Sequence, residues 1–190
     1  MMSKSAMFLI AGPSGSGQDS VIAEAIKQGL KCVRVITSVT RAKRAGESEG
    51  QPYHFLSQAE FEDGLKAGDF LEHAEYNGHL YGVRQVDLAE AKKTGWPVIW
   101  KVDHQGIKNV KQFLPEVRAI LIKPASLEEL KARLIKRGQN SAEDIEARLK
   151  IASQVLSETE IYDFVIENHN GELPLAGQKL KEIIENNLSR

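Results

Sequence analysis

The sequence has one cysteine, almost no net charge and no long apolar run, and each of these features excludes a class of protein. The single cysteine, Cys32, cannot form an internal disulfide, so we expect a reducing, cytoplasmic compartment and a thiol that packs as a small hydrophobe. A formal net charge of −1 creates no overall field that would recruit nucleic acid or an anionic membrane. The apolar run at residues 6–11 is too short for a signal-peptide core or a membrane-spanning helix.

The rest of the composition is typical of one globular domain. The 190 residues, 42% of them hydrophobic and 27% charged, can bury one core with small inserted lobes. Strand-like apolar runs lie at residues 6–11, 31–37, 97–102, 117–122 and 162–166. Helix-like periodicity lies at residues 21–26, 57–66, 85–93, 126–136, 142–156 and 173–187. Because strands and helices alternate at both ends of the chain, the sequence predicts an α/β fold whose parallel sheet has helices on both faces.

The middle of the chain, residues 37–95, breaks this alternation and is predicted to form an inserted lobe. The polar stretch over residues 38–52 is predicted to be a loop. Ser57, followed by Glu60 three residues later, predicts a capping box at the start of a helix. Asn77-Gly78 is a turn signal between two short strands.

A glycine-rich segment, residues 12–20, links the first predicted strand to the first predicted helix. This context is typical of a phosphate-binding loop, because glycines permit tight turns while backbone N–H groups and the helix dipole face the phosphates. The motif has Lys and then Ser or Thr after the last glycine, whereas this chain has Gln18 and Asp19. We expect a polyphosphate to bind at Gly12, Ser14, Gly15, Ser16, Gly17, Gln18, Asp19 and Ser20.

The inserted lobe carries a second group of residues that suit a nucleotide. Arg41 and Arg44, three apart, can fork onto one phosphate, unless they belong to a solvated basic loop. Glu72 can accept from the N1–H and 2-amino groups of guanine, unless it is a surface glutamate on an edge strand. Tyr53 and Tyr81 can each donate a hydroxyl to a phosphate or can pack in the core.

These residues belong to a longer pattern that closely resembles the guanylate kinase family. The pattern reads Thr37-Ser38-Val39-Thr40-Arg41-Ala42-Lys43-Arg44-Ala45-Gly46-Glu47, Gly50, Tyr53, Phe55, Gly68-Asp69-Phe70-Leu71-Glu72 and Tyr81-Gly82-Val83. It continues in register through Gln105-Gly106 and residues 130–138 to residues 162–166, nearly the whole chain. The resemblance implies a P-loop kinase fold with a core (1–36, 96–130 and 152–190), a GMP-binding lobe (37–95) and a lid (131–151).

The resemblance also implies roles for individual residues. The residues assigned to GMP are Thr37, Arg41, Arg44, Tyr53, Glu72, Tyr81 and Asp103. Arg137 and Arg148 of the lid, with Arg133 as a weaker member, would neutralise charge on the transferring phosphoryl group, and Arg41 would act with them. Asn168 stands at the family's adenine contact, although Asn-Asp is usual there and this chain has Asn168-His169.

Three departures from the family's pattern weaken or alter the expected site. Gln18 removes a charge that, about 4 Å from a phosphate oxygen, contributes on the order of a few kcal/mol. Asp19 and Ser20 are oxygen donors that could together hold Mg²⁺. Val83 stands where Thr or Ser would bond the guanine carbonyl, a loss of about 1–3 kcal/mol in discrimination.

Lys101 is a fourth departure, because the family has an aspartate there. It lies near the carboxyl end of a predicted strand, where parallel sheets build their sites. Our hypothesis is that Lys101 reaches the phosphates and replaces the missing lysine, which requires an ammonium within about 8 Å of the loop. The alternative is a local ion pair with Asp103, two residues further on and on the same face of the strand.

The sequence therefore predicts a nucleoside-monophosphate kinase that uses ATP and Mg²⁺ to convert GMP to GDP. Its partners would be these nucleotides, and the chain would be a monomer or a homodimer. The loss of the loop lysine leaves two alternatives open. One is a catalytically impaired binding protein that has kept the acceptor lobe, and the other is a kinase whose acceptor is a different phosphorylated compound, such as a ribose bisphosphate.

Overall fold

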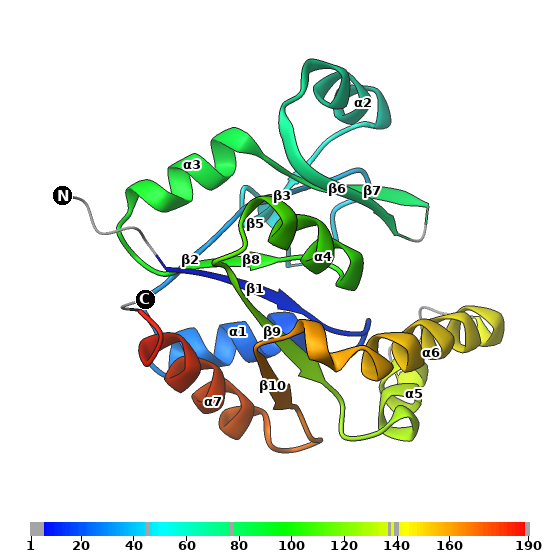
Figure 1. Ribbon diagram of the computed structural model, residues 1–190. Helices are drawn as coiled ribbons and strands as arrows, with labels where there is room; N and C mark the ends of the chain where they lie inside the picture. Colours follow the sequence, from blue (N-terminus) through cyan, green and yellow to red (C-terminus); the bar gives the residue numbers. More distant parts are fainter. Residues whose placement is uncertain (1–5, 45, 77, 137, 139–140, 189–190) are drawn as a thin grey trace.

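The core of the protein is a five-stranded parallel sheet, seen in a computed structural model that describes residues 6–44, 46–76, 78–136, 138 and 141–188 (Figure 1). The strand order is β10-β9-β1-β8-β2. The strands are β1 (Met7–Ala11), β2 (Val33–Arg34), β8 (Val98–Lys101), β9 (Arg118–Lys123) and β10 (Phe164–Glu167). The predicted α/β fold with a parallel sheet is confirmed.

Helices cover both faces of this sheet, as its apolar strands require. Phe8 and Ile10 of β1 pack against α1 (Gln18–Lys27) and α7 (Leu173–Glu185), which lie side by side below the sheet in Figure 1. Leu9 and Ala11 point the other way, into a cluster with α3 (Gln85–Lys93) and α4 (His104–Phe113). The period of two along β1 thus divides the core into two layers.

Two further helices stand at the edge where the parallel strands end. α5 (Leu127–Lys136) and α6 (Ala142–Ser157) pack on each other through Leu130, Leu134 and Ile145, and a short 3₁₀ turn, η1 (Thr159–Ile161), follows. Within the described part of the chain, none of the helices combines the length and apolar character needed to cross a membrane.

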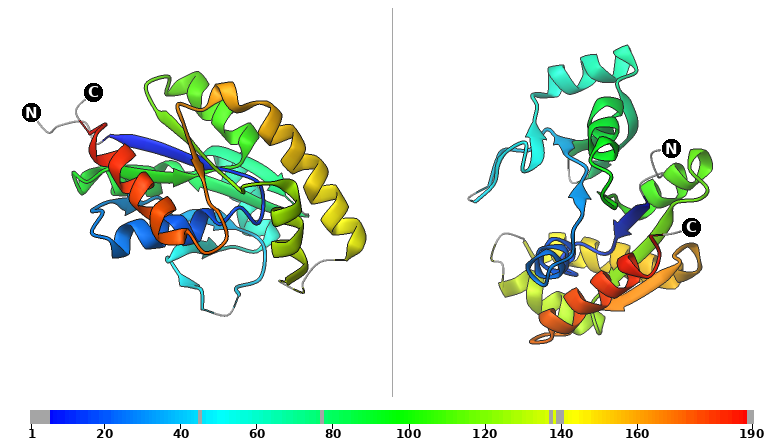
Figure 2. Two further views of the ribbon diagram at one scale, coloured as in Figure 1. Left: turned by 90° about the horizontal axis from the view of Figure 1, so that it is seen from below. Right: turned by 90° about the vertical axis from the view of Figure 1, so that its left-hand side faces the viewer.

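The inserted segment forms a second five-stranded sheet in the order β4-β5-β3-β7-β6, which stands apart from the core layers (Figure 2). Its strands are β3 (Thr37–Val39), β4 (Ser48–Glu49), β5 (Pro52–Phe55), β6 (Phe70–Tyr76) and β7 (His79–Arg84). The helix α2 (Gln58–Ala67) covers it through Phe61, whose ring stacks on Phe70 at 4.2 Å. The predicted capping box of α2 is present, since Ser57 Oγ accepts from the Glu60 N–H and Glu60 accepts from the Ser57 N–H.

The structure corrects two predictions for this segment. The predicted strand over residues 31–37 is two short strands, β2 and β3, that belong to different sheets, because the chain crosses from one to the other between them. The predicted loop over residues 38–52 contains most of β3 and all of β4. Both strands pair with β5, so backbone hydrogen bonds to that strand replace the expected loop. Of the predicted turn Asn77-Gly78, Asn77 lies outside the described residues.

The prediction also omitted α4 and misjudged two boundaries. The helix α4 begins after Asp103, whose carboxylate caps it by accepting from the Gly106 N–H at 2.6 Å. Ile107 and Val110 then face the core at helical spacing, a signal that was present in the sequence. The strand predicted at residues 162–166 is β10, which begins at residue 164, and the last helix ends at residue 185.

Candidate functional site

The glycine-rich loop connects β1 to α1 and leaves no room for side chains at its glycines. Gly15 and Gly17 have φ values of 97° and 92°, a conformation that other residues rarely adopt. A Cβ on Gly17 would lie 2.4 Å from Asn168 Nδ2, and one on Gly12 would lie 2.0 Å from the Ile122 carbonyl oxygen. The sequence between β1 and α1 therefore forms a tightly wound cradle at the amino end of a helix, where anions are stabilised.

Two side chains from the far end of the chain hold this cradle in place. Asn168, which is buried, donates from Nδ2 to the carbonyl oxygen of Ser16 at 2.8 Å. Arg133 of α5 donates to the same oxygen at 3.3 Å, and also to the carbonyl oxygen of Asn168 and to Glu129. The Asn168 carboxamide is thus engaged with the loop, while its assignment to adenine remains a prediction.

Gln18, the first residue of α1, contributes an amide in place of the expected ammonium. Its Nε2 donates to the carbonyl oxygen of Gly12 at 2.7 Å, so the side chain folds back over the loop. The contact closes the loop upon itself and adds no charge to it.

The next residue, Asp19, lies between two cations. Its carboxylate accepts from Arg34 Nη2 at 2.7 Å and from Lys101 Nζ at 2.8 Å. Burial alone would raise the pKa of Asp19, but the charges and hydrogen bonds of Lys101 and Arg34 outweigh it and lower the pKa. The predicted metal ligands Asp19 and Ser20 thus include one carboxylate that is already paired. Among the described residues there is no cluster of three or more metal-binding side chains, so phosphate oxygens and water would have to complete a Mg²⁺ sphere.

Lys101 lies at the junction of the two sheets. Its Nζ contacts Asp19 at the loop and donates to the hydroxyl of Tyr53, in β5 of the inserted lobe, at 2.5 Å. The predicted requirement of closeness to the loop is met. Within the described part of the chain, Lys101 makes no ion pair with Asp103, the local partner that we weighed as an alternative.

Arg41 is buried beside Tyr53 in the inserted lobe. Its guanidinium donates to both carboxylate oxygens of Glu47 at 2.7 and 2.6 Å and lies 4.9 Å from the centre of the Tyr53 ring. These hydrogen bonds to Glu47 raise the pKa of Arg41 above its already high normal value. Arg44 is exposed and meets Glu47 through its backbone N–H at 2.9 Å. Glu47 therefore organises both arginines of the predicted phosphate site.

Glu72 is a buried carboxyl group, as a base-recognition role would require. It lies in β6 with 9% of its surface exposed, and burial, helped by the negative charge of Asp103, raises its pKa to about 7. Thr37, also assigned to guanine, is buried in β3 of the same sheet. Val83 lies directly opposite Glu72 in the neighbouring strand and is fully buried. Val83 therefore places an apolar side chain, and not the hydroxyl of a Thr or Ser, beside the Glu72 carboxyl group.

The predicted lid contributes a second described arginine to the loop, in addition to Arg133. Arg148 of α6 donates from Nη1 to Ser14 Oγ at 2.7 Å. The helix α5 packs directly on the loop, since a Cβ on Gly15 would lie 2.9 Å from Leu130 Cδ1. Arg137, the other predicted lid residue, lies outside the described residues. Tyr81 pairs with Val39 across β3 and β7 and is partly exposed.

Arg34 is a site residue that the sequence did not predict. It ends β2, at the edge of the core sheet, yet its guanidinium reaches the Asp19 carboxylate. A single arginine in a loosely alternating apolar run carries no local signal of such a contact. Only the pairing of β2 with β8 brings it to the loop.

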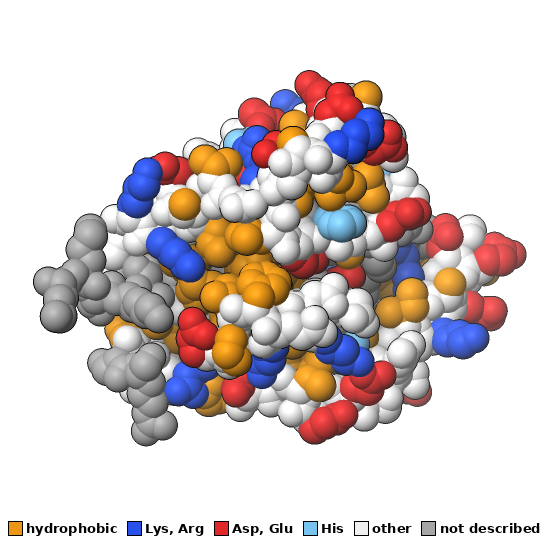
Figure 3. All heavy atoms as spheres, turned by 45° about the horizontal axis from the view of Figure 1, so that its top comes forward, with side chains coloured by type: hydrophobic (Ala, Val, Ile, Leu, Met, Phe, Trp, Pro, Cys, Tyr) orange, Lys and Arg blue, Asp and Glu red, His pale blue; other side chains and the backbone are white. Residues whose placement is uncertain are grey.

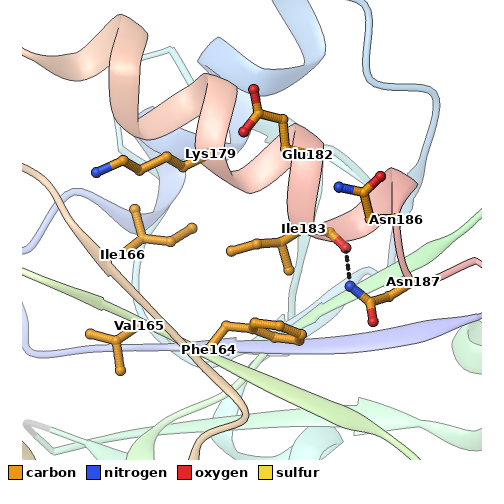
Figure 4. A pocket seen from close by; sticks show the side chains of 8 residues that line it. All are labelled: Phe164, Val165, Ile166, Lys179, Glu182, Ile183, Asn186 and Asn187. Carbon is orange, nitrogen blue, oxygen red and sulfur yellow. Dashed lines mark hydrogen bonds between the residues drawn. The ribbon is translucent and has the colours of Figure 1, made fainter.

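Two other surface features lie away from these residues. A shallow hollow between β10 and the end of α7 is lined by Phe164, Val165, Ile166, Lys179, Glu182, Ile183, Asn186 and Asn187 (Figure 4). None of the residues assigned to the nucleotides lines it. Figure 3 shows hydrophobic side chains gathered on the face that carries α3 and α4, where Val86 and Phe113 are among the exposed large hydrophobics.

Comparisons with known proteins agree with this arrangement. The sequence model of the family described as guanylate kinase matches residues 4–187. The guanylate kinase of Hahella chejuensis is 39% identical over 167 residues, 88% of this chain and 80% of that protein. The guanylate kinase of Fusobacterium nucleatum is 38% identical over 185 residues, 97% of this chain and 98% of that protein.

A solved structure extends the similarity to three dimensions. The crystal structure of guanylate kinase from Anaplasma phagocytophilum matches with a TM-score of 0.77 and 28% sequence identity. The match covers 99% of this chain and 88% of that chain. The similarity therefore includes the core sheet, the inserted lobe and the helices at the edge.

Proposed function

The chain belongs to the guanylate kinase family, and we propose that it transfers the γ-phosphoryl group of ATP to GMP, giving ADP and GDP. One observation carries this proposal: the loop and the inserted lobe meet at a single ammonium group. Lys101 Nζ lies 2.8 Å from Asp19, at the loop, and 2.5 Å from Tyr53 OH, in the lobe. A phosphate on the loop and a phosphate beside Tyr53 would therefore be neighbours, as transfer between them requires.

In this mechanism the protein positions the two nucleotides and neutralises their charge. An oxygen of the GMP phosphate attacks the γ-phosphorus, and the bond from that phosphorus to the bridging oxygen of ADP breaks. The loop amides hold the donor, while Arg41, Arg44, Tyr53 and Tyr81 hold the acceptor's phosphate. Arg148 would reach from the lid to the transferring group, and Arg137 keeps the same assignment from the sequence.

Guanine would be selected by the buried pair of Thr37 and Glu72. The Glu72 carboxylate accepts from two adjacent donors on guanine, whereas adenine does not present such a pair. Burial strengthens this discrimination, because an incorrect base leaves a buried polar group unpaired.

Magnesium would enter with ATP. The Asp19 carboxylate and the neighbouring Ser20 hydroxyl, in the first turn of α1, are oxygen donors that suit this hard cation. The ion supplies positive charge to the phosphates when it is bound. We take residues 131–151 as the lid and residues 37–95 as the acceptor lobe, and both would close over the substrates to exclude water.

The neutral contact of Gln18 with the Gly12 carbonyl favours one second candidate, a binding protein that no longer transfers phosphate. Such a protein would have kept the acceptor lobe and would bind a phosphorylated partner through Arg41 and Arg44. Against this, Arg148 still reaches the loop, and a binder of this kind has little use for that contact.

An ADP-release assay with ATP, Mg²⁺ and a panel of phosphorylated acceptors separates these functions. Turnover with GMP well above that with AMP supports the proposal. Turnover only with a ribose bisphosphate would reassign the acceptor. If the protein binds GMP but releases no ADP from ATP with any of the acceptors, the result would favour the binding protein.

A further inference from the structure

The loop of this protein has lost its positive charge at position 18. Gln18 is neutral, and its amide is engaged with the Gly12 carbonyl at 2.7 Å. Arg133 is also engaged, with Glu129, Ser16 and Asn168. If phosphate is transferred here, a cation besides Arg148 would have to replace the charge that is missing at position 18.

Lys101 reaches the same place from the neighbouring strand. It ends β8, which pairs in parallel with β1, and its register partner is Ile10. Adjacent strands are about 4.8 Å apart, so a lysine at this strand end easily spans the distance to the loop that follows β1. Its ammonium lies 2.8 Å from Asp19, the residue after Gln18.

The contacts of Lys101 join the two substrate sites. The ammonium lies 5.2 Å from the centre of the Tyr53 ring, and the Arg41 guanidinium lies 4.9 Å from the same ring. The Tyr53 ring is therefore a shared neighbour of the Lys101 ammonium and the buried Arg41 guanidinium. A group that moves from a donor on the loop to an acceptor in the lobe would pass beside Lys101.

The charges of this cluster do not balance without a ligand. The cluster contains three cations, Arg34, Lys101 and Arg41, and two anions, Asp19 and Glu47. Asp19 has a second partner in Arg34, so it remains paired when Lys101 moves away. Lys101 is thus held near the loop by a carboxylate that does not depend on it.

We propose that Lys101 is a catalytic residue that supplies, from the adjacent strand, the positive charge missing at position 18. The ion pair with Asp19 keeps the Lys101 ammonium beside the loop. When the nucleotides bind, Lys101 exchanges Asp19 for oxygens of the transferring phosphoryl group. Lys101 stays protonated throughout, since the reaction only forms one P–O bond and breaks another. The inference rests on the proposed phosphoryl transfer and adds a residue to it.

The test moves the charge from one position to the other. We compare wild type, Lys101→Met, Gln18→Lys and the double variant for kcat, KM for GMP and ATP affinity by titration calorimetry without acceptor. Lys111→Met is the matched control, because its ammonium also bridges two elements and pairs with an aspartate, Asp163, at 2.9 Å. Lys111 lies in α4, and its contacts are with Asp163 and the Ile161 carbonyl, none of them a nucleotide residue.

We expect Lys101→Met to lower kcat about 100-fold or more and to weaken ATP binding about tenfold, with KM for GMP within threefold of wild type. The double variant, Lys101→Met with Gln18→Lys, should have a kcat at least tenfold higher than that of Lys101→Met. Lys111→Met should behave as wild type. A Lys101→Met enzyme within threefold of wild type would overturn the inference, and so would a loss that Gln18→Lys does not reverse.

ATP affinity keeps this test separate from the proposed function. If wild type binds ATP but turns over no GMP, the proposed acceptor fails. The inference then stands if Lys101→Met weakens ATP binding tenfold and Gln18→Lys restores it, and falls if ATP affinity is unchanged. A wild type that does not bind ATP at millimolar concentration overturns the inference as well.

Discussion

Arg148 of α6 donates a hydrogen bond to Ser14 Oγ at 2.7 Å, so a helix of the predicted lid contacts the glycine-rich loop. The two residues are 134 positions apart in the sequence. The guanidinium therefore lies at the loop on which we propose that the phosphates of ATP bind.

The first prediction concerns this arginine. Arg148→Met removes a charge that would act on the transferring phosphoryl group, and we expect kcat to fall about 100- to 1,000-fold. Because Arg148 is only partly buried, the midpoint of urea unfolding should change little. Lys150→Met, on the same helix and exposed, is the control. Equal kcat in the two variants would remove Arg148 from the mechanism.

The second prediction is a pH dependence of acceptor binding. In the proposed complex guanine requires the ionised form of Glu72, whose pKa of about 7 leaves most of these carboxyl groups protonated at pH 6.5. KM for GMP should therefore fall about fourfold between pH 6.5 and pH 8, as the ionised fraction rises. In Glu72→Gln, KM should be higher and lack this dependence. A dependence that persists in the glutamine variant would assign it to another group.

The third prediction concerns stability and the same carboxyl group. The folded pKa of Glu72 is about 7 and its normal value is 4.5, so the folded state binds the proton more tightly than the unfolded state. Its contribution to the free energy of unfolding is therefore lost as the pH rises from about 4.5 to 7, a loss on the order of 3 kcal/mol.

Urea unfolding at pH 5 and pH 8 measures this contribution. In Glu72→Gln, the decrease in stability between the two pH values should be smaller than in wild type by that amount. Glu75→Gln is the control, because Glu75 lies in the same strand, β6, but is exposed. A decrease of the same size in wild type and in Glu72→Gln would contradict the prediction.

The fourth prediction separates backbone strain from crowding in the loop. Gly17→Ala places a side chain at a φ of 92° and 2.4 Å from Asn168 Nδ2, which would push away the residue that braces Ser16. We expect a stability loss of about 1–3 kcal/mol and a weakening of ATP binding of more than tenfold.

Gly171→Ala is the matched control, since Gly171 has a φ of 83° but no atom within 4 Å of the added Cβ. It should show a comparable backbone cost without any effect on ATP affinity, measured by titration calorimetry. Equal ATP affinity in the Gly17 and Gly171 variants would show that the fit between Gly17 and Asn168 does not matter for the nucleotide.

Much of this protein could be inferred from the sequence, because the relevant signals are local. The spacing of Ser57 and Glu60 predicted a capped helix, since the bonds of a capping box join residues three apart. The glycines of residues 12–17 predicted a tight loop between strand and helix, and Gly15 and Gly17 have φ values that most other residues rarely adopt. The alternation of apolar runs and helices predicted the parallel sheet and its two covered faces.

Tertiary structure decided what a given charge contacts. The sequence allowed two partners for Lys101, a local ion pair with Asp103 or a contact with the loop. Only the parallel register of β8 and β1 placed its ammonium at Asp19. Arg34 carried no local signal at all, because its partner lies across the strand ends and not along the chain. Local spacing determines helices, turns and loops, whereas an ion pair between distant segments depends on strand order and register, which no short stretch of sequence encodes.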